Sequence, residues 1–458
     1  MLGTNPTGYG TNRMQRIKAA CLALLAGLSL LWWLANDFTT GSYSRFWPLR
    51  ADMVQYTGVL AIAAMSGAML LAIRPRRIER LFDGLDKTYR LHKWLGIAAL
   101  ALGVVHWGWA QVPKWLVGLG WLERPLRAGA EQAKSGLAAW QHSQRGLAED
   151  IGEWAFYSAV VLLTLALLKR IPYRWFFRTH RWLALVYLAL VIHSLILMQP
   201  AYWRSALGPV MALLLLAGSL AGLVSLARRI GRRRQVIGHI HALHHHADNH
   251  VLRVDITLDG PWPGHQAGQF AFVTFDEREG PHPFSLSSAW CNDGKLAFAI
   301  KGLGDYTRTL PERLSVGDPV RVEGPYGCFD FKGRKRSQIW VAGGIGIAPF
   351  IARLQALANG SADGGGNVDL FYSTNAPDQD FIERIRQLAE RAHVRLHLMI
   401  ASEHGRLTPE RLRQQIPHWL DCDFWFCGPS GFARDLRRDL QSHGLAQGDF
   451  HQELFNMR

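Results

Sequence analysis

Cysteine is scarce in this chain of 458 residues. The five cysteines are Cys21, Cys291, Cys328, Cys422 and Cys427. They form no CxxC pair and no spacing typical of a zinc site, which argues against a zinc-stabilised fold. Five thiols so far apart also form no disulfide framework, and we expect them to be reduced and mostly cytoplasmic.

Acidic residues are also in short supply. Asp and Glu number 36 against 51 Lys and Arg, which gives a formal net charge of +15. Such a balance often indicates nucleic-acid binding. Here the basic residues gather in short stretches beside apolar runs, a pattern typical of the cytoplasmic loops of membrane proteins. We therefore expect a lipid bilayer, and no nucleic acid, as the partner of this charge.

Long apolar runs are abundant in the first half of the chain. Six are long enough to cross a bilayer as helices: residues 17–35, 53–73, 89–110, 151–169, 179–198 and 206–227. The first run follows Arg13, Arg16 and Lys18, as in a signal peptide, but it lacks a small-residue cleavage site. We expect it to be retained as the first of six spans.

The basic loops predict the orientation of these spans. Residues 74–93, 169–181 and 228–234 are rich in Arg and Lys, and with six spans they fall on the same side as the N-terminus. That side is predicted to be cytoplasmic, with the C-terminal half of the chain also inside. The expected location is a bacterial-type inner membrane.

Two of the predicted spans each carry two histidines. His92 and His106 are 14 residues apart, and His180 and His193 are 13 apart. At about 1.5 Å per residue each pair is separated by roughly 20 Å, which places one histidine near each membrane face. The predicted pairs are His92 with His180 on the inner side and His106 with His193 on the outer side.

This arrangement predicts a metal centre at each pair, as two six-coordinate haems held by bis-histidine ligation. The alternative is that each histidine is a buried polar side chain bonded to a carbonyl, but intramembrane ionisable residues usually serve a function. The second spacing is irregular, since 13 residues leave about 140° of rotation on an ideal helix. A kink, a tightened turn or a frayed helix start is therefore expected near His180.

After residue 230 the pattern changes to the alternation of an antiparallel β domain, expected over 231–335. Its first part holds a histidine cluster between His239 and His250, which we interpret as a solvated strand and turn, with a metal site as the alternative. Candidate flavin-binding residues follow. They are His282, Pro283, Phe284, Ser285, Leu286 and Ser287 at a strand end, and Lys301, Gly302 and Thr307 beside a glycine-rich turn.

Residues 336–458 are predicted to form an α/β nucleotide-binding domain. Strands are expected at 337–342, 368–373, 395–401 and 423–427. Glycines between the first strand and its helix let a dinucleotide phosphate approach, although their spacing differs from GxGxxG. The candidate nicotinamide-binding residues lie at two strand ends: Gly343, Gly344, Gly346 and Pro349, and then Cys427, Gly428 and Pro429.

Taken together, these motifs resemble the ferric reductase and NADPH oxidase family, from about residue 53 to the end. The resemblance rests on the four histidines and on the segments 282–288, 302–307, 324–327, 343–350, 427–430 and 450–455. It implies three parts: a six-helix transmembrane di-haem domain over 1–230, an FAD-binding β-barrel over 231–335 and an NAD(P)H-binding domain over 336–458. The implied cofactors are FAD, two haem b groups and NAD(P)H.

The resemblance also implies roles for individual residues. Ser285 would lie near the flavin N5, Cys427 would hold the nicotinamide, and the aromatic ring of Phe455 would cover the flavin. Electrons would pass from NAD(P)H through FAD and the haems to O2, giving superoxide, or to ferric complexes, and no obligatory protein partner is expected. Ala110 stands where oxidase members often carry another His, so the acceptor stays open.

The sequence is compatible with two further alternatives. Asn375 and Asp378 follow the strand at 368–373, where related reductases often place an Arg for the NADP phosphate, so NADPH and NADH are both retained. A membrane-anchored flavoreductase that serves a soluble partner is the alternative function.

Overall fold

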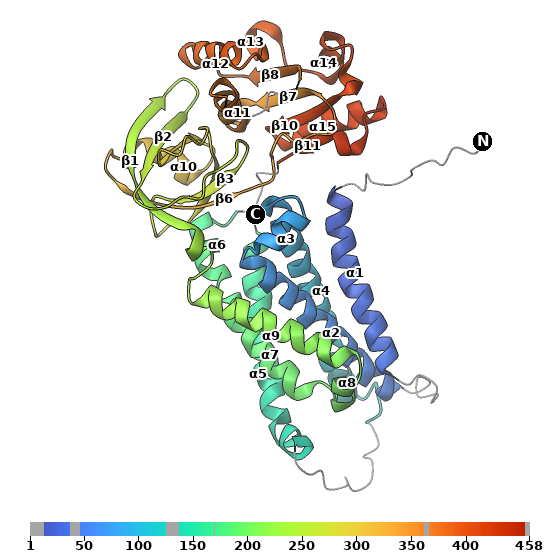
Figure 1. Cartoon of the computed structure of the whole chain (residues 1–458). Coiled ribbons are helices and arrows are strands. Elements are labelled where there is room, and N and C mark those ends of the chain that lie inside the picture. The colour runs from blue at the N-terminus through green and yellow to red at the C-terminus, as the bar shows by residue number, and fades with distance from the viewer. Residues whose placement is uncertain (1–12, 37–45, 125–136, 169, 361–365, 454–458) are drawn as a thin grey trace, which may run out of the picture. The chain divides into compact units, whose positions relative to one another are not determined.

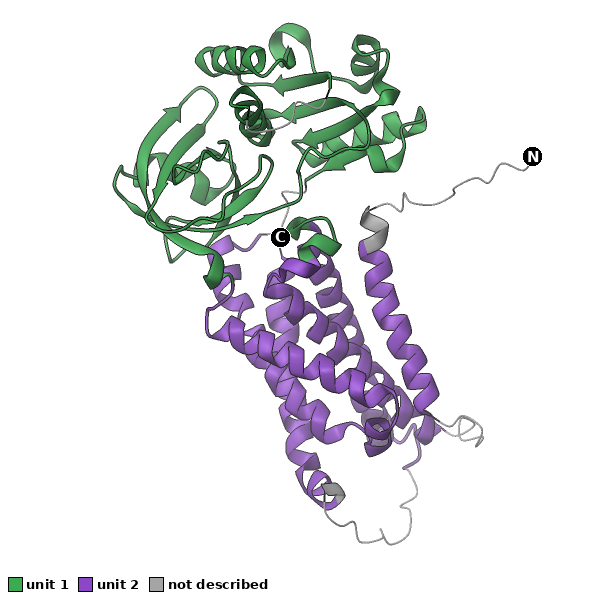
Figure 2. Cartoon of the chain, in the orientation of Figure 1, with its two compact units in different colours: residues 1–13, 79–86, 231–457 green, residues 14–78, 87–230, 458 purple. Residues whose placement is uncertain are grey.

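The computed structural model describes residues 13–36, 46–124, 137–168, 170–360 and 366–453. The chain divides into two compact units (Figures 1 and 2). Residues 14–78 and 87–230 form a helical unit, and residues 79–86 together with the chain from 231 onward form a second unit, which holds both β-sheets.

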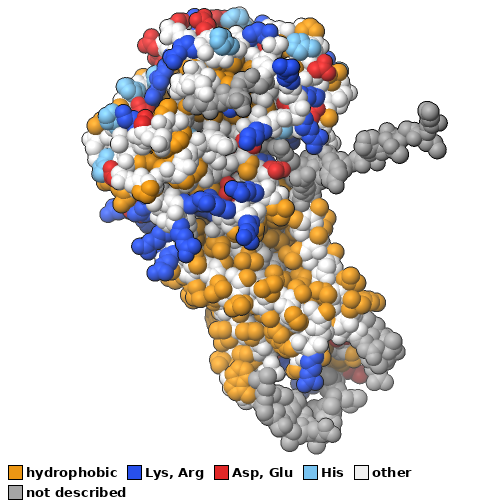
Figure 3. All heavy atoms as spheres, in the orientation of Figure 1, with side chains coloured by type: hydrophobic (Ala, Val, Ile, Leu, Met, Phe, Trp, Pro, Cys, Tyr) orange, Lys and Arg blue, Asp and Glu red, His pale blue; other side chains and the backbone are white. Residues whose placement is uncertain are grey.

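The helical unit is built from long apolar helices. Its elements are α1 (Arg13–Ala35), α2 (Phe46–Ala72), α3 (Arg76–Leu81, shared with the second unit), α4 (Leu85–Gly118), α5 (Leu137–Leu167), α6 (Tyr173–His180), α7 (Leu183–Leu197), α8 (Pro200–Arg204) and α9 (Leu207–Leu226). Six spans are long and apolar enough to cross a membrane, with α6 and α7 counted as one. The six predicted spans are thus confirmed. Figure 3 shows apolar side chains covering this unit, with Lys and Arg near its ends.

Several helices are longer than their apolar runs. The helix α4 begins at Leu85 and continues through Pro113 to Gly118, beyond the predicted 89–110. Backbone hydrogen bonding extends into polar residues at both ends, whereas hydropathy marks only the apolar middle. Between α6 and α7 the helix is interrupted at residues 181–182, so the span predicted at 179–198 is two helices.

Buried polar contacts join helices of this unit at its centre. The Tyr187 hydroxyl of α7 lies 2.9 Å from the Ser66 hydroxyl of α2, and both side chains are fully buried. In an apolar interior each hydroxyl needs such a partner, because an unpaired polar group costs free energy there. The contact therefore fixes α7 against α2.

The first sheet of the second unit is antiparallel. Its strands are β1 (Gln235–His246), β2 (Val251–Leu258), β3 (Phe270–Thr274), β4 (His282–Ser285), β5 (Lys295–Lys301) and β6 (Pro319–Tyr326), in the order β4-β3-β6-β1-β2-β5. A bridge between Leu286 and Phe298 connects the two ends of this order. The helix η3 (Arg232–Arg234) precedes β1, and α10 (Asp305–Arg313) follows β5.

The second sheet is parallel and doubly wound. Its strands are β7 (Ser337–Gly343), β8 (Val368–Thr374), β9 (Arg395–Ile400), β10 (Cys422–Cys427) and β11 (Phe450–Gln452), in the order β11-β10-β7-β8-β9. The accompanying helices are η4 (Gly344–Ile347), α11 (Ala348–Ala358), α12 (Gln379–Arg391), α13 (Ala401–His404), α14 (Pro409–Gln415), η5 (Trp419–Asp421), α15 (Ser430–Ser442) and η6 (Gln447–Asp449). The four predicted strands are confirmed as β7 to β10.

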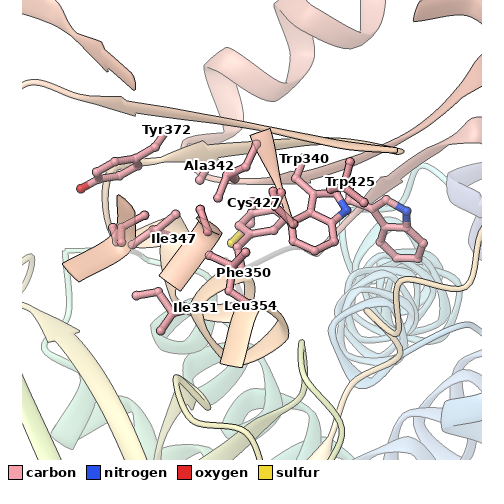
Figure 4. Packing of buried hydrophobic residues seen from close by; sticks show 14 of the residues in the cluster. Trp340, Ala342, Ile347, Phe350, Ile351, Leu354, Tyr372, Trp425 and Cys427 are labelled. Atoms are coloured by element: carbon pink, nitrogen blue, oxygen red, sulfur yellow. The ribbon is translucent and has the colours of Figure 1, made fainter. Parts of the chain in front are cut away.

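Side chains of the buried strands point alternately to the two faces of the parallel sheet, and each face carries its own hydrophobic core. Trp340 and Ala342 of β7 pack with Phe350 of α11, and Figure 4 shows this cluster. Ile339 and Val341 point to the opposite face, where α14 and α15 pack. Since successive side chains of a strand alternate between faces, a continuous apolar strand serves both cores.

The histidine cluster lies on β1 and the turn that follows it. His246 Nδ1 lies 3.0 Å from Asp378 at the start of α12, and His239 Nδ1 lies 2.9 Å from an oxygen of Asp259. Among the described residues, no three His, Cys, Asp or Glu side chains are arranged to hold a metal ion. The strand and turn predicted for this cluster are confirmed.

Candidate functional site

The structure brings the four intramembrane histidines together as two pairs. His92 of α4 faces His180, the last residue of α6, with ring centres 5.8 Å apart. His106 of α4 faces His193 of α7, with ring centres 6.2 Å apart. These are the two pairings that the sequence predicted.

Three of the four rings are held by backbone carbonyls of a neighbouring helix. His92 Nδ1 donates to the Ala68 carbonyl of α2 over 2.8 Å, and His106 Nδ1 donates to the Val54 carbonyl over 2.9 Å. The two acceptors are 14 residues apart along α2, and the two donors are 14 residues apart along α4. The two antiparallel helices therefore match in register. His193 Nδ1 donates to Ala148 O of α5 over 2.7 Å.

These hydrogen bonds fix the chemistry of the rings. A carbonyl only accepts, so Nδ1 carries the proton and Nε2 keeps its lone pair for a metal. Metal-binding histidines almost always show such a second contact. Two metal–imidazole bonds of about 2 Å, with roughly 1.2 Å from nitrogen to ring centre on each side, place ring centres about 6.4 Å apart. The observed separations of 5.8 and 6.2 Å lie close to this value and fit bis-histidine ligation of one iron.

The interruption between α6 and α7 supplies part of the rotation that the 13-residue spacing requires. The amides of Trp182, Ala184 and Leu185 each donate to the carbonyl three residues earlier. Such a 3₁₀ turn advances about 120° per residue instead of about 100°. Over three residues this adds roughly 60°, which turns His180 part of the way toward the face that carries His193. The irregularity expected from the sequence therefore includes a tightened turn.

The flavin motif lies on β4 and the residues that follow it. Ser285 and Ser287 are buried, and the Leu286 side chain packs within the antiparallel core. The His282 ring stacks on Tyr306 at 4.7 Å, and burial lowers the pKa of His282 to about 4. The His282 ring is therefore neutral near pH 7.

The predicted phosphate residues lie at the start of α10 and beside the glycine loop of the parallel sheet. The Thr307 hydroxyl accepts from the Gly304 amide over 3.0 Å and so caps the helix that follows Gly302. Lys301 Nζ lies 4.0 Å from the position that a Cβ of Gly344 would take. A positive charge and a glycine turn thus come together where an anionic cofactor could lie.

The two nicotinamide motifs meet at adjacent strand ends. Cys427 of β10 is in register with Ala342 of β7, directly before Gly343. Gly344 has a φ of +56°, and a Cβ on Gly346 would overlap the Cys427 carbonyl, so both positions require glycine. Pro349 lies in the first turn of α11. The carboxyl edge of a parallel sheet is where nucleotides bind in such folds.

Cys427 is fully buried, and this burial, with a smaller contribution from the Glu453 carboxylate, raises the pKa of its thiol well above the usual value. Glu453 is itself buried, and its Oε1 lies 3.0 Å from the place of a Gly327 Cβ. Glu453 is not among the site residues predicted from the sequence, although it stands two residues before Phe455 in the matching tail. Phe455 lies outside the described residues.

Part of the helical unit matches a known protein family. Residues 57–191 match the family described as "Ferric reductase like transmembrane component". This range contains His92, His106 and His180, and His193 lies two residues beyond its end.

Among characterised proteins, the chain is 31% identical over 150 residues to the heme-dependent oxidative N-demethylase beta subunit of Ectopseudomonas mendocina, covering 32% of this chain and 45% of that protein. It is 27% identical over 199 residues to the toluate 1,2-dioxygenase electron transfer component of Pseudomonas putida, covering 41% and 58% respectively. The chain thus spans about half the length of these relatives.

Solved structures with a similar fold cover 48% of the chain. One is the flavohem-like FAD/NAD binding domain of nitric oxide dioxygenase from Vibrio cholerae, at 22% identity, 97% coverage of that chain and a TM-score of 0.41. Another is a ferredoxin NADP+ reductase from Neisseria gonorrhoeae, at 21% identity, 98% coverage and a TM-score of 0.41.

Proposed function

We propose, from the premise that this chain joins a ferric-reductase-like transmembrane component to a ferredoxin-reductase-like module, that it is an oxidoreductase which moves electrons across a membrane. The donor is NAD(P)H, the carriers are FAD and two haem b groups, and the acceptor on the outer side is O2 or a ferric complex. The basic loops support a cytoplasmic side for the donor.

The two histidine pairs carry this proposal. They lie in one helical unit, with ring separations of 5.8 and 6.2 Å that suit one iron each. Three of the rings are oriented by helix carbonyls, which leaves Nε2 available for the iron. A set of merely structural histidines would not need to face one another in this way.

The residues of the second unit support the donor half of the reaction. Bound FAD would supply the conversion of a two-electron hydride into single electrons, and haem iron would supply one-electron steps. Ser285 and Ser287 would hold the flavin. Lys301 would lie opposite the phosphates of FAD or of NAD(P)H. Cys427 and the loop from Gly343 to Pro349 would hold the nicotinamide and exclude water. The buried, protonated Cys427 thiol brings no charge to that place.

The four proposed histidine ligands determine how the electron acceptor would reach the haem. If His92 with His180 and His106 with His193 each held one iron, they would leave no ligand position for the acceptor, which would then take its electron at the haem edge. Both O2 and ferric complexes can react in this way.

The test uses the full chain in detergent, with His92→Ala and His106→Ala as inner and outer variants. His142→Ala, in the same helical unit but outside the pairs, is the control. The wild type and the control are expected to contain two low-spin haems per FAD, and each variant is expected to lose one. Addition of NADPH or NADH should reduce the haem of the wild type.

A flavin-yellow protein without haem would refute the proposal and favour a membrane-anchored flavoreductase that serves a soluble partner. In a haem-containing protein, the acceptor is identified by comparing superoxide-dismutase-sensitive dye reduction with ferric-chelate reduction.

A further inference from the structure

Each histidine of the outer pair meets a glycine on the helix beside it. A Cβ on Gly58 of α2 would lie 3.0 Å from His106 Cε1 and 3.1 Å from its Nδ1, and a Cβ on Gly152 of α5 would overlap the His193 ring. The carbonyl that accepts the proton of His106 belongs to Val54, and that of His193 belongs to Ala148. In both cases the glycine stands four residues after the acceptor.

Helix geometry explains this spacing. A helix carbonyl points toward the C-terminal end, and the Cβ of the residue four positions later leans back toward the N-terminal end. The two groups therefore share one face, and a side chain at the later position covers the carbonyl. A glycine there leaves the carbonyl open to a second donor from a neighbouring helix.

The inner pair offers a contrast. His92 donates to Ala68, whose carbonyl lies in the last turn of α2, and the residue four positions later is Ala72, where the helix ends. An added Cβ on Gly108 of α4 or Gly146 of α5 has no neighbour within 4 Å, and one on Gly67 of α2 or Gly103 of α4 meets an apolar side chain and no histidine. The close approach to a histidine ring is thus specific to Gly58 and Gly152 among these six glycines.

We propose that Gly58 and Gly152 are positioning residues for the outer haem. By opening the carbonyls of Val54 and Ala148, they let His106 and His193 donate from Nδ1, which directs both Nε2 atoms toward one iron and raises the basicity of the ligands. This inference rests on the proposed function, because it assumes that the outer pair binds haem.

The experiment compares Gly58→Ala and Gly152→Ala in the full chain with two matched controls, Gly108→Ala and Gly146→Ala. Three quantities are measured: the ratio of haem to FAD, the midpoint potential of each haem, and the highest g-value of each haem in the electron paramagnetic resonance spectrum. The last two respond to ligand hydrogen bonding and orientation, which a merely structural role would leave unchanged.

Gly152→Ala is expected to lose the outer haem, because the methyl group occupies the place of the His193 ring. Gly58→Ala is expected to keep it with an affinity lowered about 10–100-fold, a raised potential and an altered g-value, because the Nδ1 hydrogen bond weakens. The inner haem and both controls should match the wild type. If Gly152→Ala fails to fold, as judged by absent FAD, Gly58→Ala carries the test alone.

The outcomes separate the two proposals. Two haems with wild-type potentials and g-values in Gly58→Ala would overturn the role of the glycines while leaving the electron-transfer function intact. A haem-free wild type would overturn the proposed function and this inference with it. Equal loss of both haems in a variant that keeps FAD would also contradict a role confined to the outer site.

Discussion

Asp369 of β8 should stabilise the parallel sheet through a buried charge cluster. Its carboxylate accepts from Arg395 over 2.8 and 2.7 Å and from His397 over 2.8 Å, and the side chain is only 2% exposed. Burial alone would raise the pKa of this carboxyl, but the hydrogen bonds and the positive charge of its partners outweigh burial and lower the pKa from 3.8 to about 2. The charged form is therefore favoured by folding.

The size of the effect follows from that difference. A change of roughly 1.8 in pKa corresponds to about 2.4 kcal/mol of folding free energy. Because the Arg395 side chain is 56% exposed and partly screened by water, we reduce this to about 1–2 kcal/mol. Since the folded pKa is the lower one, this contribution is complete above pH 4 and is lost as the pH falls through about 2.

The perturbation is Asp369→Asn, which keeps the shape and removes the charge. The unfolding temperature of the second unit, followed by FAD fluorescence in the full chain, should fall by about 2–8 °C. The deficit should be equal at pH 7 and pH 5 and should shrink below pH 4.

The matched control is Glu383→Gln, because the pair of Glu383 with Arg386 is about half exposed on both sides and should contribute little. An Asp369→Asn protein as stable as the wild type at pH 7, or a deficit that grows toward low pH, would refute the reasoning.

Two further predictions concern the second unit. At pH 7.5 a maleimide should label the exposed Cys291 in the folded protein, whereas Cys427 and Cys422 should react only after unfolding. The reason is that burial raises the pKa of both thiols, that of Cys422 to about 11. Mass spectrometry of labelled peptides that shows Cys427 modified in the native state would contradict this. Asp378→Ala should lower the free energy of unfolding in urea by about 1 kcal/mol, since Asp378 caps α12 by accepting from the Phe381 amide over 2.9 Å. Asp378→Asn should retain most of that cap. Equal losses in the two variants would instead assign the effect to the contact with His246.

The main elements of the fold follow from patterns local in sequence. The six spans follow from runs of apolar residues, and the parallel strands follow from short buried runs between glycines. The ends of α4 could not be predicted, because hydropathy does not register hydrogen bonding that continues into polar residues. The pairing of His246 with Asp378 was also beyond reach, because 132 residues separate two side chains with no shared pattern.

The histidine spacing shows how far the sequence argument reaches. Counting residues required an irregularity near His180 but could not choose among a kink, a tightened turn and a frayed end. The choice depends on backbone hydrogen bonds at residues 182–185, which no side chain in the run announces. For the same reason the sequence does not distinguish Gly58 and Gly152 from other small residues of apolar helices. Their contact with the histidine rings depends on how the helices pack.

The separation of the two histidine pairs along α4 has an electrical consequence. Fourteen residues correspond to about 21 Å, or roughly two thirds of a hydrocarbon layer about 30 Å thick. An electron that moves outward from one pair to the other without a proton carries its charge through most of the membrane field. At about 2.3 kcal/mol per charge for each 100 mV, an inside-negative potential of about 100 mV would favour this step by about 1.5 kcal/mol. Turnover by the proposed route would therefore depolarise the membrane, and the membrane voltage would change the free energy of this step.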